Sequence, residues 1–283
     1  MSEIELACHL SPWGQHGMIN ALSDIESAGF KGIELPAIVV EQFEDRVQVF
    51  NEILLEHHIQ LVAITAGGSK WPGMNLDEEV ERCLNIARFL KSAGARVLCL
   101  YPPKPNPEHP IEDELDLMPA ATAYGEIARR TLEQDVITCI HPEFGTLVED
   151  EKTLEKFNQM ADPEALKLCL DVGWLAEAGL SLTGFVKSYK KKLGLVHLKD
   201  LKFKKGKIAK PHKEKGKEDP RPHAVELGKG GLDLEAYVDA LLVAEFSGWA
   251  TVEFDPPEEP GRTLRSLAKA CHDYAEHTLD LVL

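Results

Sequence analysis

Eight short apolar runs alternate with amphipathic helical patterns along the whole sequence, and this alternation limits the fold more than any other feature. The strand-like runs are predicted at Ile4–Leu10, Gly32–Leu35, Gln60–Thr65, Arg96–Tyr101, Asp135–Ile140, Leu166–Asp171, Leu193–Leu198 and Trp249–Phe254. The clearest helical patterns cover Gln42–His57, Leu76–Ala93, Leu115–Gln134, Leu154–Met160, Leu234–Phe246 and Thr263–Leu283. Strands that alternate with helices pair in parallel, so this order predicts an α/β protein with one parallel sheet.

A closed (β/α)8 TIM barrel accounts for the pattern better than an open, doubly wound sheet. An open sheet that binds a dinucleotide would carry G-x-G-x-x-G after its first strand, whereas residues 8–14 read Cys-His-Leu-Ser-Pro-Trp-Gly. Polar residues stand at the ends of the predicted strands, where a barrel would gather them at one mouth. They are His9, Glu34, Thr65, Tyr101, Glu143, Asp171, His197 and Glu253. Because no internal linker is rich in Gly or Ser, we expect residues 1–283 to form a single domain.

The composition disfavours several classes of partner. A net charge of −16 and a pI near 5.1 oppose binding to nucleic acids and anionic membranes. No apolar stretch is long enough to predict a membrane helix, and the acidic N-terminus lacks the regions of a signal peptide. The six cysteines form no CxxC pair, so we expect buried free thiols in a reducing cytoplasm. The lysine-rich loop predicted at 201–226 is a local exception, either a solvated loop or an anion-binding segment.

Four apolar runs in the second half of the chain end in side chains that bind metals. A hard divalent ion prefers two or three carboxylates together with an imidazole, supplied by several elements. The candidates are His141 and Glu143 after the fifth strand, Asp171 after the sixth, His197 in the seventh and Glu253 in the eighth. Alternation along the strands would place small or apolar residues one step below them, as a packed barrel interior requires. Those residues are Cys139, Cys169, Leu195 and Thr251.

Each candidate ligand has an alternative role. Asp171 is either a ligand or the N-cap of a following helix, and His197 is either a ligand or a hydrogen-bonded core residue. Glu253 is the strongest candidate, because a carboxylate between Val and Phe is rarely buried unless it is paired or coordinating. His141 and Glu143 compete for one position. Glu143 is the first choice because a carboxylate suits a hard metal, and the other residue would then contact substrate or transfer protons.

Further polar and aromatic residues are predicted at the same mouth. Glu34 would bind a substrate hydroxyl or pair with a lysine, and His9 is a weaker candidate of the same kind. Lys199 would reach a ligand oxygen or stabilise an enolate. Trp174 would form an apolar wall of the substrate pocket, or else simply pack in the core. Asp200 is expected to anchor a loop.

With these residues, the chain resembles the xylose-isomerase-like barrel superfamily of sugar isomerases and epimerases over nearly its full length. The resemblance rests on His141-Pro-Glu143-Phe-Gly-Thr, Asp171-Val-Gly, Val-His197-Leu-Lys199-Asp200, Gly248-Trp-Ala-Thr-Val-Glu253 and Leu227-Gly228-Lys-Gly230-Gly231-Leu-Asp233. The chain looks most like the inosose dehydratase branch. Two positions depart from the family pattern: Trp174 stands where members commonly carry His, and many relatives have Glu before His in the fifth-strand pair.

The resemblance implies one Mn²⁺, Co²⁺ or Mg²⁺ ion, held by Glu143 (or His141), Asp171, His197 and Glu253. It also implies a small carbohydrate substrate and a homo-oligomer. We expect a metal-dependent isomerase, epimerase or dehydratase that acts on a keto sugar or cyclitol through an enediolate, with Glu143 or Glu253 removing the α-proton.

Two other functions are weighed against this expectation. One is a non-catalytic sugar-binding barrel that retains the metal site. The other is an abasic-site endonuclease, which needs three metals and many more histidines. Trp174 removes one histidine expected of such a nuclease, and the acidic net charge opposes the approach of DNA.

Overall fold

The computed structural model of the protein describes residues 4–14, 17–67, 69–106, 108, 117–203 and 222–281. Residues 204–221 of the predicted lysine-rich loop therefore lie outside the described residues.

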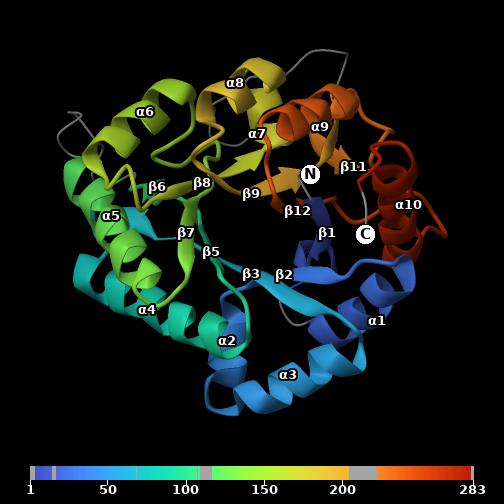
Figure 1. Ribbon diagram of the computed structural model, residues 1–283, viewed down its shortest axis with the longest axis horizontal. Coiled ribbons are helices and arrows are strands. Elements are labelled where there is room, and N and C mark those ends of the chain that lie inside the picture. The colour runs from blue at the N-terminus through green and yellow to red at the C-terminus, as the bar shows by residue number, and fades with distance from the viewer. Residues whose placement is uncertain are drawn as a thin grey trace.

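Eight parallel strands close into a barrel in the order β1-β12-β9-β8-β7-β5-β3-β2, with helices around it (Figure 1). The strands are β1 (Ile4–His9), β2 (Gly32–Pro36), β3 (Gln60–Ala66), β5 (Val97–Leu100), β7 (Ile137–Ile140), β8 (Lys167–Asp171), β9 (Leu193–Leu198) and β12 (Gly248–Val252). Each predicted strand is present, and the predicted (β/α)8 TIM barrel is confirmed. The closed order brings β7, β8, β9 and β12 side by side, so the four runs with candidate ligands are neighbours.

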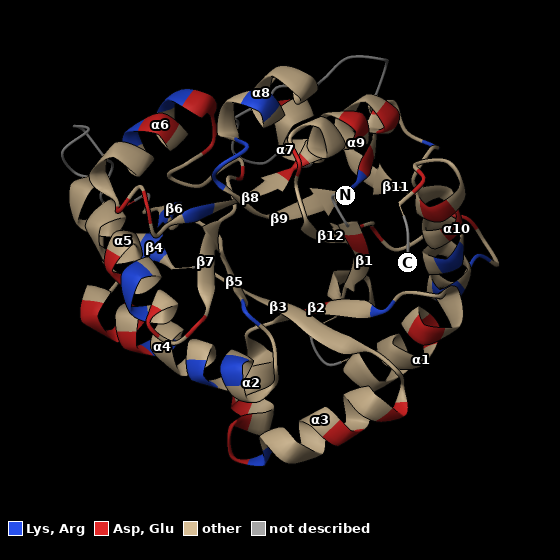
Figure 2. Ribbon diagram, viewed as in Figure 1, with Lys and Arg blue, Asp and Glu red and all other residues tan. Residues whose placement is uncertain are grey.

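The helices cover the outside of the barrel, and their apolar faces pack against the strands. They are α1 (Met18–Ala28), α2 (Ile38–Phe43), α3 (Val47–Glu56), α4 (Leu76–Ser92), α5 (Met118–Leu132), α6 (Glu151–Met160), α7 (Val172–Glu177), α8 (Leu182–Tyr189), α9 (Leu234–Val243) and α10 (Leu264–His277). The predicted helix Gln42–His57 is interrupted by a 3-10 turn at Glu44–Arg46. Acidic residues are spread over several outer helices, including α1, α3, α4 and α10 (Figure 2). In the described part of the chain, no helix is both long and apolar enough to cross a membrane.

The barrel interior is a compact layer of small and apolar side chains below the mouth. It contains Ala7, Val62, Ala63, Val97, Cys99, Cys139, Cys169 and Leu195. The residues predicted one step below the candidate ligands are at most 1% exposed. Three of them, Cys139, Cys169 and Leu195, belong to this interior cluster, as the predicted side-chain alternation requires. All six cysteines are buried and free, as predicted.

Short strand pairs extend the loops beyond the barrel. β4 (Lys70–Trp71) pairs in parallel with β6 (Lys104–Pro105), and β10 (Asp200–Lys202) pairs antiparallel with β11 (His223–Val225). The Asp200 carboxylate accepts hydrogen bonds from four backbone N–H groups. These belong to Leu201, Gly228, Gly230 and Leu232. Asp200 thus anchors the glycine-rich turn after β11, as predicted.

Candidate metal centre

Three buried side chains from neighbouring strands converge at the C-terminal mouth of the barrel. His141, Asp171 and His197 each offer a ligand atom within 4.8 Å of those of the other two, and none of the three residues is more than 2% exposed. His141 follows β7, while Asp171 and His197 are paired in the register of β8 and β9. Parallel strands in a barrel end at the same face, which explains this convergence.

Glu253 lies beside this group, directly after β12. Its Oε2 is 3.6 Å from Nδ1 of His197, and its backbone N–H donates to the carbonyl of Leu198 on the neighbouring strand. The side chain is 17% exposed, so it faces both the buried cluster and the mouth.

The structure brings His141, rather than Glu143, to Asp171 and His197. Nε2 of His141 is 3.4 Å from Oδ2 of Asp171. Glu143 is half-buried, and its backbone carbonyl accepts hydrogen bonds from Thr146 in a turn. The prediction that both side chains would share one inward face assumed that strand geometry continued to Glu143. It does not, because β7 ends at Ile140.

The two carboxylate oxygens of Asp171 have different partners. Oδ1 caps α7 and accepts from the backbone N–H groups of Gly173 at 2.6 Å and Trp174 at 3.3 Å. Oδ2 faces His141 and Lys199. Burial alone would raise the pKa of Asp171, but Lys199 and His141 outweigh it and hold the pKa well below its usual range. Asp171 is thus the N-cap of α7, one of the two roles predicted for it, and its second carboxylate oxygen still faces the site.

The Lys199 ammonium lies between two carboxylates. Its Nζ is 2.9 Å from Oδ2 of Asp171 and 2.7 Å from Oε2 of Glu253. Burial lowers the pKa of Lys199, but the two carboxylates raise it well above the ordinary value. The lysine stem passes close to Gly173, where a Cβ atom would come within 2.6 Å of Cδ of Lys199. This close approach explains why a glycine follows the Asp171-Val pair.

Glu34 orients the imidazole of His197 from the opposite side. Oε2 of Glu34 is 3.0 Å from Nε2 of His197, and its other oxygen accepts a hydrogen bond from Thr65. Glu34 and His197 are both 0% exposed. Burial would raise the pKa of Glu34, but His197, His9 and Thr65 lower it to about 2. Glu34 thus pairs with a histidine and not with a lysine, which was one of the two partners predicted from the sequence.

His9 presents one ring nitrogen to the site. Its Nδ1 accepts a hydrogen bond from the backbone N–H of Ser11 at 3.1 Å, so the neutral ring carries its proton on Nε2. Nε2 is buried, lies 4.0 Å from Oε1 of Glu34 and has no hydrogen-bond partner among the described residues. Burial lowers the pKa of His9, which favours this neutral form.

Trp174 packs in the core beside the site. It is 2% exposed, and its indole N–H donates to the carbonyl of Glu149 at 3.1 Å. Its ring meets Phe185 edge-on at 5.6 Å. The indole ring and its N–H both have partners within the protein. These contacts fit the second role predicted for Trp174, which is packing in the core.

Two residues make contacts in the site that were not predicted from the sequence. Thr65 donates to Glu34, and the Tyr101 ring lies 4.6 Å from that of His141. Both are among the polar residues that end the predicted strands, so a signal for them was present. What the sequence did not provide was the partner of each side chain.

The chemistry of these residues fits a divalent metal ion. Both ring nitrogens of His141 and Nδ1 of His197 are buried without a hydrogen-bond partner in the described ranges. Such orphaned polar atoms are rare in proteins and call for an explanation. A cation would satisfy Nδ1 of His197 and one of the two ring nitrogens of His141. Two imidazoles beside two carboxylates suit Mn²⁺, Co²⁺ or Zn²⁺ better than Mg²⁺.

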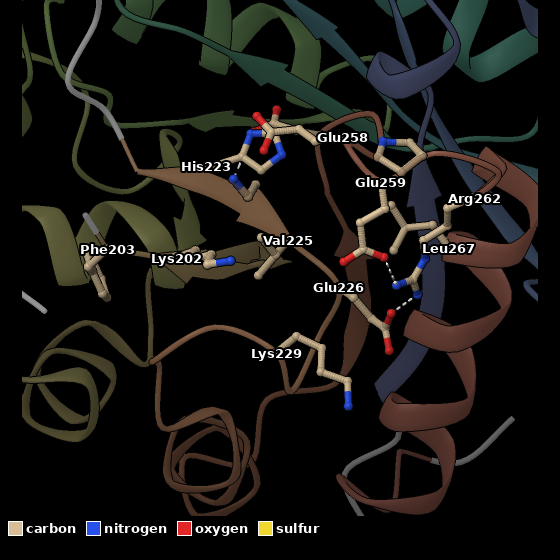
Figure 3. A pocket seen from close by; sticks show the side chains of 13 residues that line it. Lys202, Phe203, His223, Val225, Glu226, Lys229, Glu258, Glu259, Arg262 and Leu267 are labelled. Atoms are coloured by element: carbon tan, nitrogen blue, oxygen red, sulfur yellow. Dashed lines mark hydrogen bonds and ion pairs between the residues drawn. The ribbon is translucent and has the colours of Figure 1, made fainter. Parts of the chain in front are cut away.

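A separate hollow of about 630 Å³ lies beside β11 and the segment after β12 (Figure 3). Arg262, on its wall, pairs with Glu226 and with Glu259. His223 pairs with Asp255 at 2.9 Å. None of the candidate ligands lines this hollow, so it is distinct from the metal centre.

Similarity to known proteins agrees with this architecture. The family model described as xylose isomerase-like TIM barrel matches residues 22–270. The chain belongs to this family. An inosose dehydratase of Clostridium botulinum (strain Eklund 17B / Type B) is 24% identical over 247 residues, which cover 82% of this chain and 80% of that protein.

Two solved structures share the fold over almost their whole length. The IOLI protein with a bound zinc atom has a TM-score of 0.75 and 18% identity, and the match covers 98% of each chain. D-psicose 3-epimerase with D-tagatose from Clostridium cellulolyticum H10 has a TM-score of 0.77 and 13% identity, covering 98% of this chain and 99% of that one. The predicted family is confirmed, and the relatives indicate an enzyme of the isomerase, epimerase or dehydratase class.

Proposed function

We propose that this protein is a divalent-metal-dependent isomerase, epimerase or dehydratase that acts on a keto sugar or cyclitol. The observation that carries the proposal is the buried group of His141, Asp171 and His197 at the barrel mouth, with Glu253 beside it. The names of the relatives support the substrate class, because they include an inosose dehydratase and an epimerase with a bound ketose.

The proposed metal ligands are His141, Asp171, His197 and Glu253. His141 takes the place first assigned to Glu143, because its ring is buried beside Asp171 and its nitrogens have no hydrogen-bond partner in the part of the chain described. Of the Mn²⁺, Co²⁺ and Mg²⁺ that the family resemblance implies, the second imidazole favours Mn²⁺ or Co²⁺.

The pair of Glu34 and His197 supports this assignment. A histidine that binds a metal through one nitrogen usually donates its other ring N–H to a carboxylate, which fixes the tautomer and the ring orientation. Here Nε2–H of His197 would donate to Glu34, and Nδ1 would face Glu253 with its lone pair available. Glu34 is therefore proposed as the residue that positions His197, rather than as a contact to substrate.

The bound ion would stabilise the negative charge that develops on the substrate oxygens when the α-proton leaves. Lys199 carries a fixed positive charge at the same place and would donate a hydrogen bond to one of those oxygens. Nε2–H of His9 would donate to another oxygen of the substrate. Glu253 and Glu143 remain the proposed acid–base residues, because neither residue is fully buried: the Glu253 side chain is 17% exposed and Glu143 is half-buried.

Two variants test the ligand assignment. We expect His141→Ala to lose stoichiometric Mn²⁺ binding and Glu143→Gln to retain it, measured by electron paramagnetic resonance (EPR) of free Mn²⁺ on protein first stripped of metal. Circular dichroism checks that both variants are folded. Retention of Mn²⁺ by His141→Ala together with its loss in Glu143→Gln would return the ligand role to Glu143. Failure of the wild type to bind any divalent ion at this site would refute the proposed function.

A further inference from the structure

Three thiols line the barrel interior directly below the proposed metal centre. Cys99 on β5, Cys139 on β7 and Cys169 on β8 are each 0% exposed and pack in the same interior cluster. Cys169 precedes Asp171 by two residues on one strand, so its side chain points the same way, one step deeper. Soft sulfur ligands therefore lie next to a site whose carboxylates suit harder ions.

Two of these thiols share a neighbour with the metal centre. One ligand atom from each of Cys99, Cys169 and His197 lies within 4.8 Å of those of the other two. In a tetrahedral zinc site the metal–sulfur and metal–nitrogen bonds place such atoms roughly 3.5–3.8 Å apart. Side-chain shifts of about an ångström would therefore close this group around an ion.

We propose that Cys99, Cys169 and His197 form a second metal site, which takes a thiophilic divalent ion such as Zn²⁺ or Cd²⁺. Ligand softness separates it from the centre above, because thiolates select soft or borderline ions and carboxylates select hard ones. Two thiolates and a neutral imidazole also cancel the charge of the ion. A neutral complex suits the dry interior of the barrel, where an unpaired charge would be costly.

Binding at this site exchanges protons for metal. Two S–H bonds break, two metal–sulfur bonds form, and two protons leave to solvent.

Nε2 of His197 is paired with Glu34, so an ion in either site would bind through Nδ1. Sharing this nitrogen makes occupation of the two sites mutually exclusive, and this consequence alone rests on the proposed function. A thiophilic ion bound to His197 from below removes that imidazole from the centre above. Zn²⁺ or Cd²⁺ in the lower site would then displace Mn²⁺ and inhibit the enzyme.

The test is a titration of metal-free protein with Cd²⁺, followed by the ultraviolet absorption of thiolate-to-Cd²⁺ charge transfer. We expect one equivalent of Cd²⁺ to produce this band in the wild type. Cys99→Ala and Cys169→Ala should lose the band. Cys83→Ala should keep it, because Cys83 is equally buried but lies on α4, outside the barrel interior.

The same samples separate this inference from the proposed function. Mn²⁺ binding, read by EPR, should survive in Cys99→Ala, and Cd²⁺ should release Mn²⁺ from the wild type but not from that variant. Absence of a thiolate band in folded wild type, or a band that persists in folded Cys99→Ala, overturns the second site whatever the Mn²⁺ result. If Cys169→Ala does not fold, the presence or absence of the Cd²⁺ band in Cys99→Ala tests the second site. Failure of Mn²⁺ to bind while the Cd²⁺ band appears would instead count against the proposed function alone.

Discussion

Lys199→Met replaces the ammonium between two proposed metal ligands with an uncharged side chain of similar length. Lys199 lies 2.9 Å from Asp171 and 2.7 Å from Glu253 and forms an ion pair with each carboxylate. Removing one partner of a buried ion pair costs about 3–5 kcal/mol, because it leaves uncompensated charge behind. Since 19% of the Lys199 side chain is exposed, we expect the lower end of this range, about 3 kcal/mol.

A bound metal ion changes this outcome. The ion takes over the neutralisation of both carboxylates and would repel the ammonium, so Lys199→Met should cost far less stability in the loaded protein. By linkage, the variant should bind Mn²⁺ more tightly than the wild type, by at least about tenfold, which corresponds to about 1.4 kcal/mol. The metal-free variant should melt roughly 5–10 °C below the wild type, and saturating Mn²⁺ should remove most of that difference.

Thermal unfolding with and without Mn²⁺, together with an EPR titration, measures both effects. Lys91→Met is the matched control, because Lys91 forms an exposed ion pair with Asp135 at 3.0 Å, away from the site. An exposed pair contributes about 0–1 kcal/mol, and its loss should not depend on Mn²⁺. Equal destabilisation of Lys199→Met with and without Mn²⁺, or weaker Mn²⁺ binding, would refute the reasoning. Lys199 would then hold the ligands in place rather than compete with the ion.

Three further predictions concern the surroundings of the site. Asp200→Ala leaves four backbone N–H groups, three of them in the glycine-rich turn, without their acceptor. The free energy of unfolding, measured with urea, should fall by about 3 kcal/mol or more, and an unchanged value would show that water replaces the carboxylate. Gly173→Ala forces Lys199 and Asp171 aside, so it should lower the free energy of unfolding by about 1–3 kcal/mol and also lower turnover. Unchanged stability and turnover would contradict this prediction. Burial lowers the pKa of His197, but Glu34 and Glu253 outweigh it and raise that pKa. Protons therefore compete with the ion, and the apparent Mn²⁺ affinity should fall from about pH 8 to about pH 6. Titrations at several pH values check this, and a pH-independent affinity would exclude His197 as a ligand.

The strands and helix ends could be predicted because their signals are local. Short apolar runs marked the barrel strands. Asn75 stands before acidic residues, which is typical of a helix start, and it caps α4 by accepting from the backbone N–H groups of Asp77 and Glu78. Gly29 adopts the left-handed conformation that ends α1. Such features depend on neighbouring residues only, so one sequence is enough to read them.

The partners within the site could not be predicted, because they depend on strand register and on where each strand stops. Glu34 and His197 are 163 residues apart and meet across the barrel. Whether His141 or Glu143 lies beside Asp171 depends on where β7 ends, at Ile140, and on the chain that follows it. The single-domain organisation, the homo-oligomer and the cytoplasmic location stay predictions.

The central claim is that this chain's own metal site removes a proton next to a substrate carbonyl. The most direct measurement is Mn²⁺-dependent incorporation of solvent deuterium into ketoses and inososes, followed by NMR, for the wild type, Asp171→Asn and Glu253→Gln. The account predicts exchange at a carbon next to the carbonyl of at least one substrate in the wild type, its loss on removal of metal, and its loss in both folded variants. Full exchange by metal-free protein or by Glu253→Gln would contradict the account, and metal binding without exchange on any substrate would indicate a binding protein instead of an enzyme.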